Sequence, residues 1–179
     1  MSAKREERIA VRLRELSQLF NLMDPSPFVE RDLDAGAEEF IVGWARELPP
    51  HRELELVIHL ATPPSPERAA GTEEAVRHYF ANRAEVKQRE LRLMLRRGRA
   101  SLLIGLLFLA GCFGLSELGD RTLPGGWRDF TSLGLQIVGW VAMWRPLEIY
   151  LYDWWPIRND MSLLRRLARM KVNLKVAEG

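Results

Sequence analysis

Apolar and polar side chains alternate in three separate segments of this chain, residues 8–14, 54–60 and 171–176. An alternation with a period of two predicts a strand that buries one face. A strand as late as the third would join the first two and bring the end of the chain beside its beginning. Two strands alone are marginally stable, whereas three strands with a helix packed on one face form a viable sheet.

Segments with helical periodicity lie between the first two predicted strands and after the second. From Ala37 to Leu48, apolar residues recur at spacings of three and four, with Asp34 as the expected N-cap and Pro49-Pro50 as the stop. A second helix is expected to start at Thr72 and to continue without a helix breaker toward the middle of the chain. Its partial apolar stripe must pack on its own domain, on the helix expected at 160–169 or on a second copy.

Two stretches in the middle of the chain predict membrane spans. Residues 100–118 contain one charged residue, Glu117, and approach the roughly 20 residues that a helix needs to cross a bilayer. The alternative, a buried core helix, is disfavoured because a soluble domain of this size rarely hides a helix that is apolar on every side. The second span, residues 130–157, contains Pro146 and ends in tyrosines and tryptophans typical of an interfacial belt. It either crosses fully or bends at Pro146 to lie along the interface.

Basic residues predict the orientation of these spans. They are dense before the first span and after the second, but the connecting loop, residues 119–129, carries only Arg121 and Arg128. The positive-inside rule therefore places both termini in the cytoplasm. The segment up to Arg8 leads into no apolar signal region, so the first span is expected to direct insertion.

These elements predict an α+β membrane protein, in which a two-helix transmembrane hairpin carries a small cytoplasmic domain with a two- or three-stranded sheet and an amphipathic helix. Over the 179 residues, the expected order is an α+β domain in 1–71, a helical stalk in 72–99, transmembrane helix 1 in 100–118, an external loop in 119–129, transmembrane helix 2 with an interfacial end in 130–157, and a cytoplasmic helix and terminal strand in 158–179. The net charge of +2 is small, and where the positive charges lie is more informative than their number.

Polar residues of the second span are the main candidates for a site: Arg145, Glu148, Asp153, Trp154 and Trp155. Arg145 and Glu148 stand three apart and can pair on one helix face. Ionisable groups inside a membrane point to function. The favoured interpretation is nevertheless a position at the cytoplasmic interface, where arginine snorkels and carboxylates are hydrated. Under either interpretation this group is a candidate membrane-interface or intersubunit contact.

Residues next to the spans suggest further contacts. Arg96, Arg97, Arg99 and Arg158 are candidates for binding anionic lipid headgroups, and their place beside a membrane helix makes the bilayer, not nucleic acid, the expected partner. Small residues four apart in the first span are expected to pack against the second span, with oligomerisation as the second use. The two pairs are Ser101 with Gly105 and Ala110 with Gly114.

Reactive chemistry is sparse in this sequence. The single cysteine, Cys112, excludes an internal disulfide and a zinc-type cysteine pair, and the three histidines share no metal-ligand spacing. The HExxH, P-loop, G-x-S-x-G and dinucleotide-binding patterns are absent. Asp24 to Phe28 is typical of a rigid turn, and Asp32 and Asp34 are more typical of a solvated charged run than of a metal site. We therefore expect no cofactor, no metal and no enzymatic activity.

Several motifs resemble an uncharacterised family of small bacterial two-span inner-membrane proteins. They are Phe20-Asn21, the DPSPF segment 24–28, Glu30–Asp34 and the unusual WRPLEIYLYDWWPI segment 144–157. The resemblance covers most of the chain and implies a bacterial inner-membrane location with two spans. It implies no activity and no catalytic residue.

Three functional hypotheses follow. The favoured one is a non-enzymatic scaffold or accessory subunit whose cytoplasmic domain forms a homo-oligomer or binds a partner protein. An oligomeric channel or transport component is the first alternative, and it requires Arg145 and Glu148 to face a water-filled interior. An enzyme at the membrane surface is the second, and it requires Asp32 and Asp34 to converge with His59 or another base.

Overall fold

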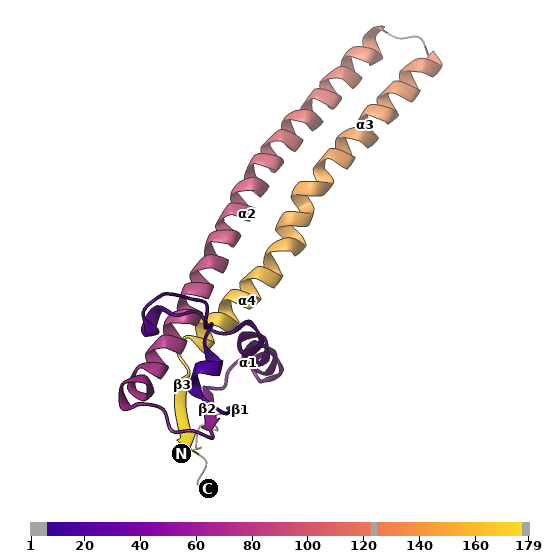
Figure 1. Cartoon of the computed structure of the whole chain (residues 1–179). Helices are drawn as coiled ribbons and strands as arrows, with labels where there is room; N and C mark the ends of the chain where they lie inside the picture. Colours follow the sequence, from indigo (N-terminus) through magenta and orange to yellow (C-terminus); the bar gives the residue numbers. More distant parts are fainter. Residues whose placement is uncertain (1–6, 123–124, 177–179) are drawn as a thin grey trace. The chain divides into compact units, whose positions relative to one another are not determined.

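The computed structural model describes residues 7–122 and 125–176, and the chain folds into two compact units (Figure 1). The first, called the sheet unit, comprises the residues up to Gln88 together with those from Asn159 onward. The second, called the hairpin unit, is Arg89–Arg158. The sheet unit is therefore assembled from segments on both sides of the hairpin unit in the sequence.

Three parallel strands form the sheet in the order β1-β2-β3: β1 (Glu7–Leu13), β2 (Leu54–Leu60) and β3 (Lys171–Val176). The register aligns Ile9 with Leu56 and Leu56 with Val172. Aligned side chains point to the same face, so these three residues form one apolar row across the strands. The α+β class and the third strand, both expected from the sequence, are confirmed.

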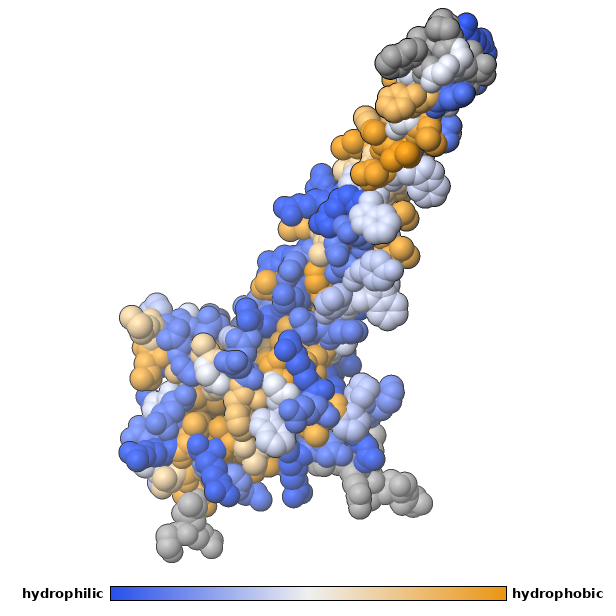
Figure 2. All heavy atoms as spheres, turned by 90° about the vertical axis from the view of Figure 1, so that its right-hand side faces the viewer, coloured by the Kyte–Doolittle hydropathy of each residue, from blue (hydrophilic) through white to orange (hydrophobic). Residues whose placement is uncertain are grey.

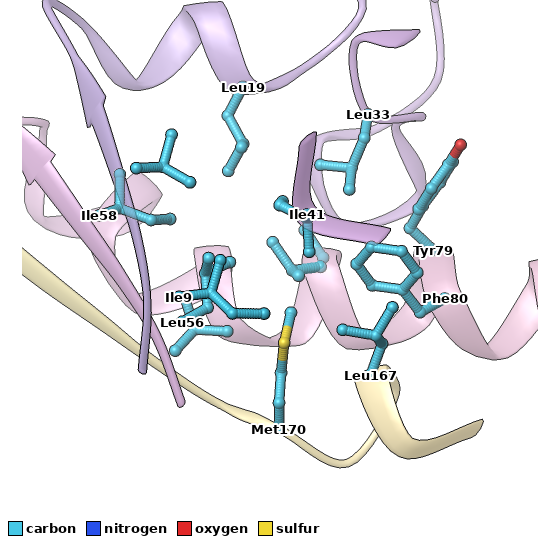
Figure 3. Close-up of a cluster of buried hydrophobic side chains, with 14 of the residues drawn as sticks. Ile9, Leu19, Leu33, Ile41, Leu56, Ile58, Tyr79, Phe80, Leu167 and Met170 are labelled. Carbon is cyan, nitrogen blue, oxygen red and sulfur yellow. The ribbon is translucent and has the colours of Figure 1, made fainter. Parts of the chain in front are cut away.

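Helices cover one face of this sheet. They are α1 (Ala35–Glu47), the first half of α2 (Pro66–Thr122) and the end of α4 (Trp154–Leu167). Two 3-10 turns, η1 (Leu16–Leu19) and η2 (Phe28–Glu30), connect β1 to α1. Figure 3 shows the core between helices and strands, to which Ile41, Ile58, Phe80 and Leu167 each contribute a fully buried side chain. Each such burial stabilises the fold by about 1.5–3 kcal/mol, so the core holds the two chain segments together.

α1 begins at its expected cap. The Asp34 carboxylate accepts hydrogen bonds from the amides of Gly36 (2.9 Å) and Ala37 (3.2 Å). These bonds satisfy two of the four amides that the start of a helix leaves unpaired. Asp34 therefore has a structural role at the start of α1.

The predicted apolar stripe of α1 is only partly buried. Ile41 and Ala45 lie in the core, but Phe40 and Trp44 keep 44% and 48% of their surface exposed. The rings of Phe40 and Trp44 pack against each other with centroids 6.2 Å apart. The stripe is wider than the surface that the sheet and the other helices cover, and the excess is an exposed aromatic pair.

α2 begins at Pro66, earlier than the expected start at Thr72. Proline suits the first turn of a helix, where its missing amide would be unpaired in any case. Thr72 is buried inside the helix, and its hydroxyl donates to a backbone carbonyl one turn earlier (2.6 Å). Much of the stalk expected at 72–99 therefore belongs to the core of the sheet unit, through Ala75, Val76, Tyr79, Phe80 and Ala84.

The hairpin unit consists of the second half of α2, α3 (Gly125–Glu148), a π-helical turn η3 (Ile149–Asp153) and the start of α4. Both long helices extend into the segment 119–129 that the sequence predicts as a loop, and residues 123 and 124 between them lie outside the described part of the chain. α2 continues because no proline interrupts it before Pro124 and because Glu117 pairs with Arg121 one turn later (3.0 Å).

The second face of the sheet is mainly polar, although Val57 of β2 is buried on it. Here Glu55 of β2 accepts hydrogen bonds from Arg8 Nε of β1 (2.7 Å) and from Asn173 Nδ2 of β3 (2.6 Å). Burial acts to raise the pKa of the Glu55 carboxyl, but these hydrogen bonds outweigh it and the pKa is lowered. One carboxylate thus links all three strands.

The substitution Glu55→Gln tests this link. Since the folded pKa lies below the ordinary value of 4.5, ionised Glu55 stabilises the fold above that value, and this stabilisation is lost as the pH falls through the folded pKa. We expect Glu55→Gln to cost about 1 kcal/mol at neutral pH and to make stability less dependent on acid. Urea unfolding in mild detergent, followed by circular dichroism at neutral and acidic pH, measures both effects. An equal loss at both pH values would contradict a role for the ionised carboxylate.

Candidate functional site

Pro146 lies inside α3 and is fully buried. It has no amide to donate, so the carbonyl four residues earlier, that of Ala142, loses its usual partner within the helix. This carbonyl faces α2 at Gly105, where an added Cβ would lie 3.4 Å from the Ala142 oxygen and 3.6 Å from the Pro146 ring. The missing side chain at Gly105 lets the two backbones approach closely.

The other glycines of the hairpin differ in their surroundings. A Cβ at Gly139 of α3 would lie 2.7 Å from Leu109 Cδ1 of α2, so Gly139 also lies at the contact between the helices. A Cβ at Gly114 would meet nothing within 4 Å. The expected contact of Gly105 with the second helix is confirmed, but the same expectation for Gly114 is wrong, because Gly114 lies on another side of α2.

Directly after Pro146, the π-helical turn η3 changes which side chains share a face. In a regular α-helix, a residue four positions later is rotated by about 40° around the helix axis, and one eight positions later by about 80°. Asp153, eight residues after Arg145, would therefore lie well off the helix face of Arg145. A π-helical turn takes more residues, and Arg145 Nη1 reaches both Glu148 Oε2 (3.1 Å) and Asp153 Oδ2 (3.5 Å). Glu148 also accepts a hydrogen bond from Trp144 Nε1 (2.9 Å). Arg145 therefore has two carboxylate partners close by in sequence.

This cluster borders a cavity of about 440 Å³ between α2 and the segment of α3 and η3. Its polar lining comes from Arg145 and Asp153 on one side and from Glu90, Arg97 and Ser101 of α2 on the other. Leu93, Met94 and Ile149 supply its apolar walls. Charged groups beside apolar walls suit a boundary between water and lipid.

Aromatic residues follow the cavity. The Trp154 Nε1 group donates to the Tyr150 carbonyl (2.8 Å), the rings of Trp154 and Trp155 lie 4.9 Å apart, and the Arg158 guanidinium lies 5.4 Å from the Trp154 ring. Trp155 is 56% exposed. Trp154, Trp155 and Arg158 thus form one contiguous group, in which Arg158 makes a cation–π contact.

The candidates for headgroup binding lie at separate places. Arg96, Arg97 and Arg99 are all exposed on α2, and of these three only Arg97 lines the cavity. Sequence reasoning missed Glu90 and Met94. Their spacing to Arg97 and Ser101 follows one helix face, so helical periodicity could have grouped them. Nothing local could have placed that face opposite Arg145.

By length and composition, α2 is the one helix among the described residues that can cross a membrane. Only 17% of the most apolar 18-residue stretch of α2 is buried, whereas a core helix of a soluble protein is mostly buried. Figure 2 shows apolar side chains gathered on the surface of the hairpin unit. α3 is less apolar because Gln136, Arg145 and Glu148 interrupt it, so a clear pair of spans is not evident from hydropathy.

Comparisons with protein-family models, with curated proteins and with solved structures give no match. The family resemblance of the DPSPF and WRPLEIYLYDWWPI segments therefore stays a prediction.

The glycine contacts can be tested with a matched pair of variants. A Cβ at position 105 lies 3.1 Å from Met143 Sδ and in contact with the Ala142 carbonyl and the Pro146 ring, so the larger leucine side chain has to push α3 away. A Cβ at position 114 meets nothing within 4 Å. We expect Gly105→Leu to destabilise the helix pair by about 1–3 kcal/mol and Gly114→Leu to have little effect. Thermal unfolding in detergent micelles, followed by circular dichroism, measures the difference. Equal stability of the two variants would rule out close packing at Gly105.

Proposed function

We propose that this chain is a non-enzymatic membrane scaffold or accessory subunit. In this proposal α2 and α3 cross a bacterial inner membrane as a hairpin and hold the sheet unit on the cytoplasmic side. The sheet unit then serves as the part that binds a second copy or a partner protein.

The pairing of β3 with β2 carries the proposal. β2 precedes the apolar stretch of α2, β3 follows the hairpin unit, and the two strands are hydrogen-bonded neighbours in one sheet. Two strands of one sheet must lie on the same side of a membrane. If α2 crosses, the chain must therefore cross back before β3, and α3 is the long helix available for the return.

α3 has the length and the polar partners that a return span needs. Its 24 residues extend about 36 Å, more than the roughly 30 Å of a hydrocarbon core. Its Ser132 hydroxyl lies 2.8 Å from the Ser116 hydroxyl of α2, and Gln136 donates to Ser132 (3.3 Å). The first of these hydrogen bonds joins the two helices and the second lies within α3, and both reduce the cost of placing such polar groups in lipid.

The two alternative functions receive less support. A channel needs Arg145 and Glu148 in a water-filled interior, but Arg145 is already paired with two carboxylates on its own segment. An enzyme needs Asp32 and Asp34 to converge with His59 or another base. Asp34 caps α1 on the face of the sheet that the helices cover, whereas His59 aligns with Arg12 and Lys175 on the polar face.

Labelling of single cysteines tests the topology. In a Cys112→Ser background, we expect a membrane-impermeant maleimide to label Arg121→Cys in intact spheroplasts. It should label Arg52→Cys and Lys175→Cys only after permeabilisation, because the pairing of β2 and β3 keeps both positions on the same side. Labelling of Lys175→Cys together with Arg121→Cys would contradict the return span.

Exposed apolar side chains support a position for the proposed binding surface of the sheet unit. A rigid aromatic pair such as Phe40 and Trp44 is typical of the anchors of protein interfaces. We expect Phe40→Gln with Trp44→Gln to reduce the mass of the complex purified from native membranes, measured by native mass spectrometry. The control is Leu22→Gln with Met23→Gln, which changes an apolar pair that is even more exposed. An unchanged mass in the first variant, or an equal loss in both, would exclude the aromatic pair as the contact.

A further inference from the structure

A second cavity lies in the sheet unit, at the edge where β2 and β3 begin. It has a volume of about 920 Å³ and lies between the end of α1, the loop to β2, α4 and the start of β3. We call it the basic groove because six basic side chains line it against two carboxylates. The basic residues are Arg46, Arg52, Arg165, Arg166, Arg169 and Lys171, and the carboxylates are Glu53 and Asp160.

Arg166 is fixed by two hydrogen bonds to backbone carbonyls. Its Nη2 donates to the Pro49 carbonyl (2.6 Å) and its Nε to the Arg52 carbonyl (2.9 Å). Burial lowers the pKa of the Arg166 guanidinium, against the opposing field of Glu7. Among the described residues, the hydrogen bonds of Arg166 go to carbonyls, which orient the charge without neutralising it. A preoriented guanidinium is well suited to bind an anion.

The neighbouring groups leave the groove positive. Of the two carboxylates, Asp160 is paired with Arg46 at 3.1 Å. Arg165 donates to a neutral group, the Gln88 amide oxygen (3.1 Å). Arg52 and Arg169 are exposed at the groove. Positive charges gathered in one concave surface raise the local concentration of anions.

We propose that the basic groove binds a polyanion that carries phosphate groups. The guanidinium group of arginine binds phosphate through paired N–H donors. Several arginines around one cavity therefore favour a ligand that carries more than one phosphate group. The volume lies in the range of small-molecule sites and exceeds what a single phosphate fills. The ligand is a soluble diphosphate or the headgroup of a phospholipid that carries two phosphates, which share this chemistry. The site goes beyond the scaffold function and does not depend on how often the chain crosses a membrane.

The test uses the full chain in a mild non-ionic detergent and isothermal titration calorimetry. Inorganic pyrophosphate is the soluble probe, short-chain cardiolipin, whose headgroup carries two phosphates, is the lipid probe, and short-chain phosphatidylcholine is the zwitterionic control. We expect at least one of the two anionic probes to bind, more weakly as salt is added. Binding of pyrophosphate supports a soluble ligand, and binding of cardiolipin alone supports a lipid headgroup.

Two double variants assign the binding to the groove. Arg52→Gln with Arg169→Gln removes two exposed cations of the groove, whereas Arg12→Gln with Arg14→Gln removes two exposed cations elsewhere on the sheet unit. We expect the first to weaken binding at least about tenfold and the second to change it less than about twofold. Thermal melts check that both variants are folded. Absence of binding by both anionic probes, or equal weakening in the two variants, would overturn the proposal.

Discussion

The pairing of β3 with β2 is the constraint on which the rest of this structure depends. It seals the second edge of the central strand, places Val172 in the core and provides the Asn173 amide for Glu55. It also requires the long insertion between β2 and β3 to leave one sheet and return to it. An even number of membrane crossings is then the outcome compatible with a membrane-spanning α2, whatever the hydropathy of α3.

Local sequence patterns predicted much of the sheet unit. Residues close together in the sequence are enough to predict the alternation in β1, β2 and β3, the cap at Asp34 and the periodicity of α1. The start of α2 at Pro66 was missed because proline is best known for interrupting helices, although it also suits their first turn. The exposure of Phe40 and Trp44 was missed because periodicity tells which side chains share a face but not how much of that face is covered.

The candidate site was predictable only in part. The spacing of Arg145 and Glu148 indicates a pair on one helix face, and the structure has it. The approach of Asp153 depends on a π-helical turn, which has no clear signature in the residues that form it. The opposite wall of the cavity comes from α2, and no local pattern reports which helix face meets which. Gly105 and Pro146 illustrate the same limit, because their meaning appears only when the Ala142 carbonyl is known to face α2.

The placement of the hairpin unit between β2 and β3 has a consequence for biogenesis. During synthesis, β2 leaves the ribosome well before β3, and α2, α3 and α4 are made in between. Until β3 arrives, one edge of β2 is open and the apolar face around Leu56 lacks Val172. Contacts this distant in sequence form late and slowly. Completion of the sheet therefore marks a chain whose helices have already been synthesised. A chain that still lacks these helices has an open β2 edge, which chaperones and proteases can recognise.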